Sequence, residues 1–285
     1  MKQILLVLMV AVQAVLLQGA QADDNSSLRV MTFNIRYGTA PDGENAWPNR
    51  KELVLDAIRE YDPHLLGLQE CLRDQLLTIL DEFPRYSTLG IGRNEDGGGE
   101  YSPLLYDRTR FDVIQAGTFW LSDTPEERGS KSWGNDITRI CTWALLFDRS
   151  SGDRLRVFNT HWDHVSQPSR IKSGELICQR LESSSADKPI IVMGDFNVGP
   201  KNPARESLSA AGLRDSFVDV QPDGGQVGTF HRFTGKATSD KIDAILINKH
   251  WKTLDAEIVT AGKNDRFPSD HFPVTATLEI QDSSP

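Results

Sequence analysis

The chain has 285 residues, of which 39% are hydrophobic and 25% charged, so it can bury a large core. Its formal net charge of −9 at pH 7 argues against a dedicated DNA- or RNA-binding protein, because such proteins gain affinity from positive charge. A nuclease is still compatible with this charge, since bound metal and a few arginines can supply positive charge locally.

The first 22 residues have the features of a secretory signal peptide. Lys2 gives a positive start, residues 4–17 are apolar apart from Gln13, and Ala20-Gln21-Ala22 resembles a cleavage site. The apolar run is too short to span a membrane, so we expect cleavage near Ala22 and a secreted or periplasmic protein, with a retained membrane anchor as the alternative. The three cysteines allow either one disulfide with one free thiol or three free thiols.

Hydrophobic periodicity predicts strands and helices along the rest of the chain. In chain order we expect a strand at 28–33, a helix at 50–61, a strand at 65–69, a helix at 72–83, strands at 86–91, 102–106 and 111–121, a hairpin of strands at 140–147 and 155–159, a helix at 169–181, a strand at 189–193, a helix at 204–211, and strands at 242–247 and 274–280. Because strands outnumber helices and helices lie between pairs of strands, we predict an α/β fold of two stacked sheets with outer helices, in one domain formed by residues 23–285.

Short polar clusters lie at the ends of several of these strands, where ordinary strands have turn residues of no fixed chemistry. These clusters repeatedly contain Asn, Asp, Glu and His, the side chains that a hard divalent cation and a phosphate ester require. The clusters are Phe33-Asn34, Gln69-Glu70, residues 160–164, residues 194–197, residues 240–243 and Ser269-Asp270-His271.

Glu70 and the pair Asp195 and Asn197 are the first candidates for chemistry. Glu70 ends a run too apolar to favour a charge, so we interpret it as a metal ligand. Asp195 and Asn197 follow a buried strand on the same side; Asp195 could accept a proton from water and Asn197 could donate to a phosphate oxygen. Taken alone, this pair is explained better by an Asx turn.

Asp270 could bind a metal while His271 contacts the scissile phosphate; a capped turn with a surface histidine is the alternative. Asp243 adjoins a buried strand, so it is a better partner for the ring N–H of His271 than Asp240, which we interpret as an exposed loop charge.

Residues 161–164 offer a further phosphate contact. His161 could donate to a phosphate oxygen, and Asp163 is expected on the same strand face, with Trp162 and His164 on the other. A zinc site of His and Asp is the rival interpretation. Because most candidate ligands are carboxylate and amide oxygens, Mg²⁺ or Mn²⁺ fits better than Zn²⁺.

Together and in this order, the clusters resemble the endonuclease/exonuclease/phosphatase superfamily, whose fold is similar to that of deoxyribonuclease I. The similarity extends from about residue 28 to 280. Residues 32–37, 139–143 and 159–164 most resemble the secreted bacterial branch. The resemblance implies a four-layer α/β/β/α sandwich of two packed mixed sheets with outer helices.

The resemblance also implies a role for each site residue. Asn34 and Glu70 match metal-site positions and Asp270 a carboxylate near the metal. The catalytic residues implied are a phosphate-contacting His161, a water-activating Asp195, a phosphate-contacting Asn197, and Asp243 paired with the transition-state stabiliser His271. Arg36, Arg139 and Asp163 are added as substrate-binding candidates, since arginine binds phosphate in a bidentate manner, although surface ion pairs would explain either arginine equally well.

The expected function is therefore that of a secreted, Mg²⁺- or Mn²⁺-dependent hydrolase of phosphoric esters. A glycoside hydrolase with a carboxylate pair and an inactive binding module on the same fold are the alternatives. The expected substrate is a phosphorylated small molecule, a phospholipid head group or nucleic acid. We expect a monomer with no stable nucleic-acid partner and no membrane span.

Overall fold

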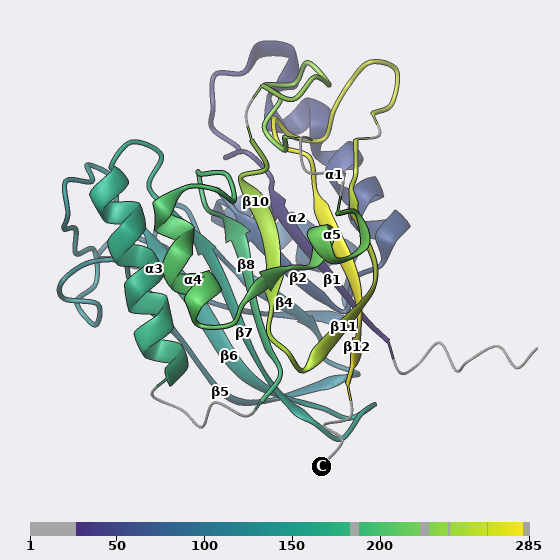
Figure 1. The fold of residues 1–285 in the computed structure, drawn as a ribbon. Helices are drawn as coiled ribbons and strands as arrows, with labels where there is room; N and C mark the ends of the chain where they lie inside the picture. Colours follow the sequence, from purple (N-terminus) through teal and green to yellow (C-terminus); the bar gives the residue numbers. More distant parts are fainter. Residues whose placement is uncertain (1–26, 183–187, 223–227, 239, 261, 282–285) are drawn as a thin grey trace, which may run out of the picture.

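The computed structural model describes residues 27–182, 188–222, 228–238, 240–260 and 262–281 (Figure 1). The signal peptide predicted at residues 1–22 lies outside these residues. Within the described ranges, no helix has both the length and the apolar character needed to cross a membrane.

Two six-stranded mixed sheets form the centre of the molecule. The first has the order β11-β12-β1-β2-β4-β3, with bounds β1 Leu28–Asn34, β2 Leu65–Gln69, β3 Tyr86–Leu89, β4 Leu104–Asp107, β11 Trp251–Ile258 and β12 Val274–Ile280. The second has the order β5-β6-β7-β8-β10-β9, with bounds β5 Phe111–Trp120, β6 Ile140–Asp148, β7 Arg154–His161, β8 Ile190–Asp195, β9 Arg214–Asp215 and β10 Asp243–Ile247. The pairs β1–β2 and β7–β8 are parallel, and the other neighbouring strands are antiparallel.

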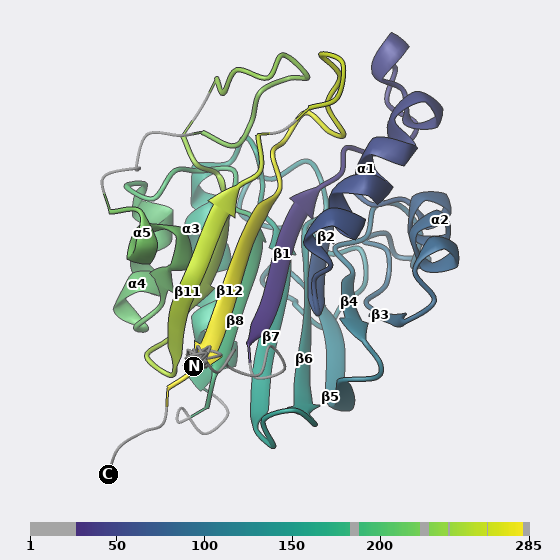
Figure 2. The ribbon, with the colours of Figure 1, turned by 90° about the vertical axis from the view of Figure 1, so that its right-hand side faces the viewer.

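Helices cover the outer faces of both sheets, as Figure 2 shows. The first sheet carries α1 (Trp47–Tyr61) and α2 (Arg73–Glu82), and the second carries α3 (Gln167–Glu182) and α4 (Glu206–Ala210). The short α5 (Ser216–Val220) packs against β10 and β11. The predicted four-layer α/β/β/α sandwich is confirmed.

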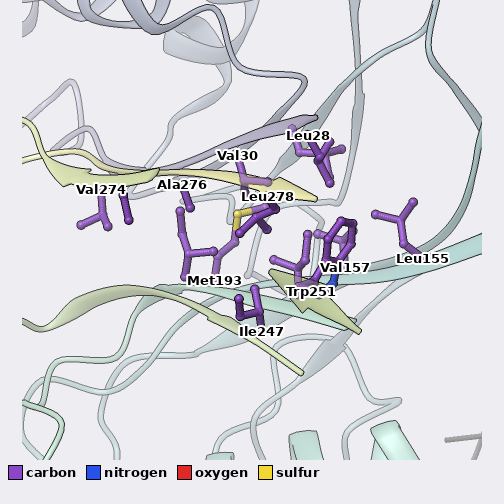
Figure 3. Close-up of a cluster of buried hydrophobic side chains, with 14 of the residues drawn as sticks. Leu28, Val30, Leu155, Val157, Met193, Ile247, Trp251, Val274, Ala276 and Leu278 are labelled. Carbon is purple, nitrogen blue, oxygen red and sulfur yellow. The ribbon is translucent and has the colours of Figure 1, made fainter. Parts of the chain in front are cut away.

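Side-chain alternation along the strands produces the layers. In β1, Leu28 and Val30 enter the core between the sheets, whereas Met31 and Phe33 pack with residues of α1 and α2. Figure 3 shows the core between the sheets, where strands of both sheets contribute aliphatic side chains and Trp251. Each large apolar side chain that is fully buried stabilises the fold by roughly 1.5–3 kcal/mol.

The same inward-facing rows change from apolar to polar toward one end of the sandwich. In β8, Ile191 and Met193 lie in the core between the sheets, and Asp195 is the next residue of that row. The register pairs Asp195 with His161 of β7 and with Asp243 of β10. Strand alternation therefore gathers the predicted polar residues at one end of the molecule.

A buried layer of amides separates this polar end from the apolar core. Gln69 Nε2 donates to Asn159 Oδ1 (2.7 Å), and Asn159 Nδ2 donates to the carbonyls of Leu68 and Pro103 (2.9 and 2.8 Å). A Cβ at Gly67 would lie only 2.7 Å from Asn159 Oδ1, so only glycine fits there. These bonds join the two sheets immediately beneath the site.

One predicted helix differs from the structure, and three elements were not predicted. The helix predicted at 204–211 is a 3₁₀ turn, Pro203–Arg205, followed by α4, because Asn202 caps the turn by accepting from the Ala204 N–H (2.9 Å). Strand β11 was not predicted, since a bulge between Thr253 and Asp255 interrupts its alternation. Helix α5 and the two-residue β9 were also not predicted.

Of the two cysteine states expected from the sequence, the structure has three free thiols. Cys71, Cys141 and Cys178 are all buried and unbridged, and Cys71 packs in the cluster beneath α1 and α2.

Candidate active site

Asn34, at the end of β1, is the meeting point of the site. Its Nδ2 lies 3.2 Å from Glu70 Oε1, 3.0 Å from Asp195 Oδ2 and 3.5 Å from His271 Nε2. Asn34 is fully buried, so its amide cannot exchange these contacts for water. Three predicted site residues from separate segments of the chain thus lie around the Asn34 amide.

Glu70 follows β2 in an unusual backbone conformation. Its φ is +56°, and Arg36 and Asn197 also have positive φ values, of +54° and +52°. Such conformations cost roughly 1–3 kcal/mol for residues other than glycine, and they concentrate at functional sites. The Tyr37 N–H donates to Glu70 Oε2 (3.2 Å), which fixes one carboxylate oxygen of Glu70.

Arg36 links three carboxylates on this side of the site. Its Nε and Nη2 donate to the two oxygens of Asp42 (3.0 and 3.1 Å). Nη1 lies 3.7 Å from Glu70, and Nε lies 3.8 Å from Asp270. The hydrogen bonds to Asp42, followed by the charges of Asp270 and Glu70, raise the pKa of Arg36 despite its partial burial, so it stays charged.

Arg50 holds together the loop after β1 and the loop before β12. It was not predicted as a site residue. It is 1% exposed and donates to the carbonyls of Ile35 (2.6 Å), Arg36 (2.8 Å) and Pro268 (2.9 Å). Nothing in the sequence distinguishes Arg50 from an exposed helix residue, because its partners are backbone carbonyls distant in sequence.

His271 and Asp243 form a buried pair. His271 Nδ1 lies 2.9 Å from Asp243 Oδ2, and His271 Nε2 faces Asp195 Oδ2 at 3.9 Å. Burial by itself lowers the pKa of His271, but the carboxylates of Asp243, Asp195 and Asp270 outweigh it and raise the pKa to about 10. His271 is therefore an imidazolium at neutral pH.

Asp195 lies between the two histidines of the site. It accepts the backbone N–H of Asn197 at Oδ1 (2.8 Å), and its Oδ2 is 3.4 Å from His161 Nε2. Burial, followed by the negative charge of Asp243, raises the pKa of Asp195 to about 7. Asp195 can therefore take up and release a proton near neutral pH.

His161 has the opposite electrostatic character to His271. Burial, followed by the positive charge of Arg139, holds the pKa of His161 well below its usual range. His161 is therefore neutral at neutral pH and can donate only one N–H. His161 and His271 consequently carry different charges.

The structure corrects the expected geometry after His161, because β7 ends at that residue and alternation does not continue. Asp163 is 1% exposed and accepts the N–H groups of Val165 and Ser166 (2.9 and 2.6 Å). It is not among the described residues that line the cavity of the site. His164, expected on the opposite face from His161, lines the cavity with it.

These side chains surround a cavity of about 310 Å³. Eight predicted site residues line it, namely Arg36, Glu70, Arg139, His161, Asp195, Asn197, Asp270 and His271. Asn34 and Asp243 lie behind this lining, within hydrogen-bonding distance of residues that form it. Seven further residues that were not predicted as site residues complete the lining, namely Tyr37, Arg93, Glu100, Ile137, His164, Phe230 and Ile242.

Comparison with known sequences identifies the family. A sequence model of the Endonuclease/Exonuclease/phosphatase family matches residues 31–271. The chain belongs to this family. The curated relatives of this family member include an uncharacterized mimivirus protein, L388, 26% identical over 61% of the chain and 68% of the viral protein. Mouse Nocturnin is 22% identical over 88% of the chain and 64% of that protein. A Ccr4 exoribonuclease subunit from Emericella nidulans is 20% identical over 86% of the chain, which spans about half of that relative's length (49%).

Solved structures of family members match over nearly their full length. A Bacteroides vulgatus member has a TM-score of 0.82 with 32% identity, covering 90% of this chain and 99% of that one. A mannosyl-6-phosphatase of Bacteroides thetaiotaomicron has a TM-score of 0.80 with 28% identity, covering 89% and 100%.

The charge and donor atoms at Glu70 and Asp270 fit a divalent cation. Burial raises the pKa of Asp270, and the negative charge of Glu70 raises it further, so bound positive charge would relieve this repulsion. The carboxylate oxygens of Glu70 and Asp270 suit Mg²⁺ or Mn²⁺. Asn34 turns its Nδ2 toward Glu70, and its Oδ1 accepts the backbone N–H of Arg36 (3.1 Å). Ligand atoms of Asp195, Asp243 and His271 also lie within 4.8 Å of one another, but the 2.9 Å contact of His271 Nδ1 with Asp243 engages that pair.

Proposed function

We propose that this family member is a divalent-metal-dependent hydrolase of phosphoric esters in which water attacks phosphorus in line with the leaving oxygen. The observation that carries the proposal is the set of contacts of Asn34, whose amide lies within 3.5 Å of Glu70, Asp195 and His271. In this proposal Glu70 is the cation-binding carboxylate, Asp195 the proton acceptor and His271 the charged donor, and all three lie around the Asn34 amide.

In this proposal Glu70 is the principal ligand of Mg²⁺ or Mn²⁺, with Asn34 and Asp270 beside it. When bound, the cation neutralises phosphate charge and stabilises the leaving oxygen. Arg36 stays charged and lies near both carboxylates, so it can also contact the phosphate.

Asp195 is assigned the activation of water. Its pKa of about 7 matches the task of accepting a proton near neutral pH, since the best general base titrates close to the working pH. The N–H of Asn197 holds the other oxygen of Asp195 and so fixes the orientation of the carboxylate.

Three donors are assigned to the charge that grows on the phosphate oxygens. The imidazolium of His271, kept protonated by Asp243, supplies a charged N–H, and neutral His161 supplies a second donor. Asn197 uses one amide N–H on the carbonyl of Trp162 (3.0 Å), which leaves its other N–H for the cavity.

The relatives support ester hydrolysis and leave the substrate open. The Ccr4 subunits are named exoribonucleases, and a solved relative is named a mannosyl-6-phosphatase; both names describe cleavage of phosphoric esters. Family membership argues against a glycoside hydrolase.

We infer further that residues 1–22 direct secretion, and that the protein is a monomeric member of the secreted bacterial branch with no stable nucleic-acid partner.

The proposal predicts metal-dependent turnover of phosphoric esters. The mature chain should hydrolyse at least one of a phosphomonoester, a phosphodiester, a phospholipid or an oligonucleotide with Mg²⁺ or Mn²⁺. EDTA should abolish turnover, because the oxygen donors then lack the cation that offsets their charge. Full activity in EDTA, restoration by Zn²⁺ alone, or inactivity on every ester would contradict the proposal, and the last result would favour an inactive binding module.

A further inference from the structure

Arg36 lies at the edge of the proposed cation site and has two kinds of contact there. Its Nε and Nη2 donate to both oxygens of Asp42, at 3.0 and 3.1 Å. Its distances to Glu70 Oε2 (3.7 Å) and Asp270 Oδ2 (3.8 Å) are too long for hydrogen bonds. The guanidinium therefore lies beside both carboxylates of the cation site and donates to neither of them.

The main chain of Arg36 is held at both of its polar groups. Its N–H donates to Asn34 Oδ1 (3.1 Å), and its carbonyl accepts from Arg50 Nη2 (2.8 Å) and Gln75 Nε2 (3.0 Å). Because the main chain is fixed in this way, the position of the guanidinium depends on the side-chain torsions. The bidentate contact with Asp42 restrains these torsions.

Asp42 is itself anchored, at the start of the 3₁₀ turn Gly43–Asn45. The carbonyl of Asp42 accepts the N–H of Asn45 (3.0 Å), and the carbonyl of Asn45 accepts from Arg50 Nε (2.8 Å), which ties the turn to α1. Asp42 is not among the described residues that line the cavity, whereas Arg36 is. Arg36 is thus the link between Asp42 and the site.

Without this restraint Arg36 could take the place of the cation. A shift of about 1 Å would bring its guanidinium within hydrogen-bonding distance of Glu70 or Asp270. A carboxylate oxygen that accepts an arginine N–H has one lone pair fewer for a metal, and the two positive charges repel each other. The contact with Asp42 opposes such a shift, because it already uses Nε, the nitrogen that lies 3.8 Å from Asp270.

We propose that Asp42 is a positioning residue that keeps the guanidinium of Arg36 off the oxygens of Glu70 and Asp270, so that a divalent cation can bind them. This role rests on the hydrolase function proposed above, which assigns the cation to Glu70. Asp42 uses Nε and Nη2, and within the described part of the chain Nη1 donates no hydrogen bond, so Nη1 is left for the phosphate contact assigned to Arg36.

Titration calorimetry of the mature chain with Mn²⁺ tests this role through binding, without turnover. Arg36→Ala should raise Mn²⁺ affinity at least about threefold, because a positive charge beside the carboxylates is lost. Asp42→Asn should lower the affinity at least about tenfold, because an amide holds the guanidinium less well and Arg36 then pairs with Glu70 and Asp270. In the Arg36→Ala background, the loss caused by Asp42→Asn should be at least about fivefold smaller, since only the direct effect of the lost charge remains.

Asp112→Asn is the matched control. Asp112 is exposed on β5, outside the cavity lining, and accepts from Nε and Nη2 of Arg149, so this variant loses a bidentate pair of the same kind. It should leave Mn²⁺ affinity unchanged. Melting each variant in EDTA separates weaker metal binding from loss of folding.

The outcomes separate the two proposals. Unchanged or weaker Mn²⁺ binding in Arg36→Ala would overturn the positioning role, whether or not Asp42→Asn folds. An equal loss on Asp42→Asn in both backgrounds would also overturn it, because Asp42 would then act on the cation directly. Either result leaves the hydrolase intact. A wild type that binds no Mn²⁺ would overturn both proposals, and one that shows the expected affinities but hydrolyses no ester would overturn the hydrolase alone.

Discussion

Glu70→Gln should reduce kcat/KM for the best ester at least about 100-fold while leaving the melting temperature nearly unchanged. The substitution preserves the shape of the side chain, and the Tyr37 N–H can still donate to the remaining amide oxygen. It removes the negative charge that the proposed cation requires. Titration calorimetry with Mn²⁺ should accordingly show weaker binding.

Glu52→Gln is the matched control for this experiment, since Glu52 is exposed on α1 and does not line the cavity. It should leave both activity and Mn²⁺ affinity at wild-type values. Unchanged Mn²⁺ affinity in Glu70→Gln would move the principal ligand role to another residue.

Asp243→Asn and His271→Ala should be strongly non-additive. In the proposed mechanism Asp243 acts through His271, which lies 2.9 Å away and whose pKa it raises, so removing both should cost little more than removing His271 alone. We expect His271→Ala to lower kcat/KM at least about 100-fold. A double mutant whose loss equals the product of the two single losses would show that the residues act independently.

The same pair predicts a change in the pH profile. The proposed mechanism uses the imidazolium form of His271, so activity should fall as pH rises through its pKa of about 10. Asp243→Asn removes a charge that raises this pKa, so the alkaline limb should move to lower pH. An alkaline limb at the same pH in Asp243→Asn would contradict the pairing.

Strand alternation made much of this architecture predictable. The apolar runs of the sequence placed Asn34, Asp195 and Asp243 in polar clusters at strand ends, and the two sheets bring these ends together. Alternation failed after His161 because β7 ends there, and Asp163 turns inward to accept backbone N–H groups.

Other features depend on contacts that sequence patterns do not contain. Arg93 and Glu100 lie at either end of a Gly-rich loop that has the composition of a simple surface loop. The bond from the next residue, Tyr101, to Cys71 holds this loop beside the cavity. Arg50 is buried by backbone carbonyls from two distant segments. The positive φ of Glu70 is imposed by its surroundings, because residue type alone disfavours it.

The central claim is hydrolysis by attack of water on phosphorus, and the position of an oxygen label tests it directly. The mature protein with Mg²⁺ should be given glucose 1-phosphate in ¹⁸O-labelled water, because this ester can be cleaved at either its P–O or its C–O bond. Mass spectrometry of the released phosphate should show one ¹⁸O atom per turnover, with no release in EDTA. Unlabelled phosphate, which requires cleavage at the sugar carbon as in a glycoside hydrolase, would contradict the account.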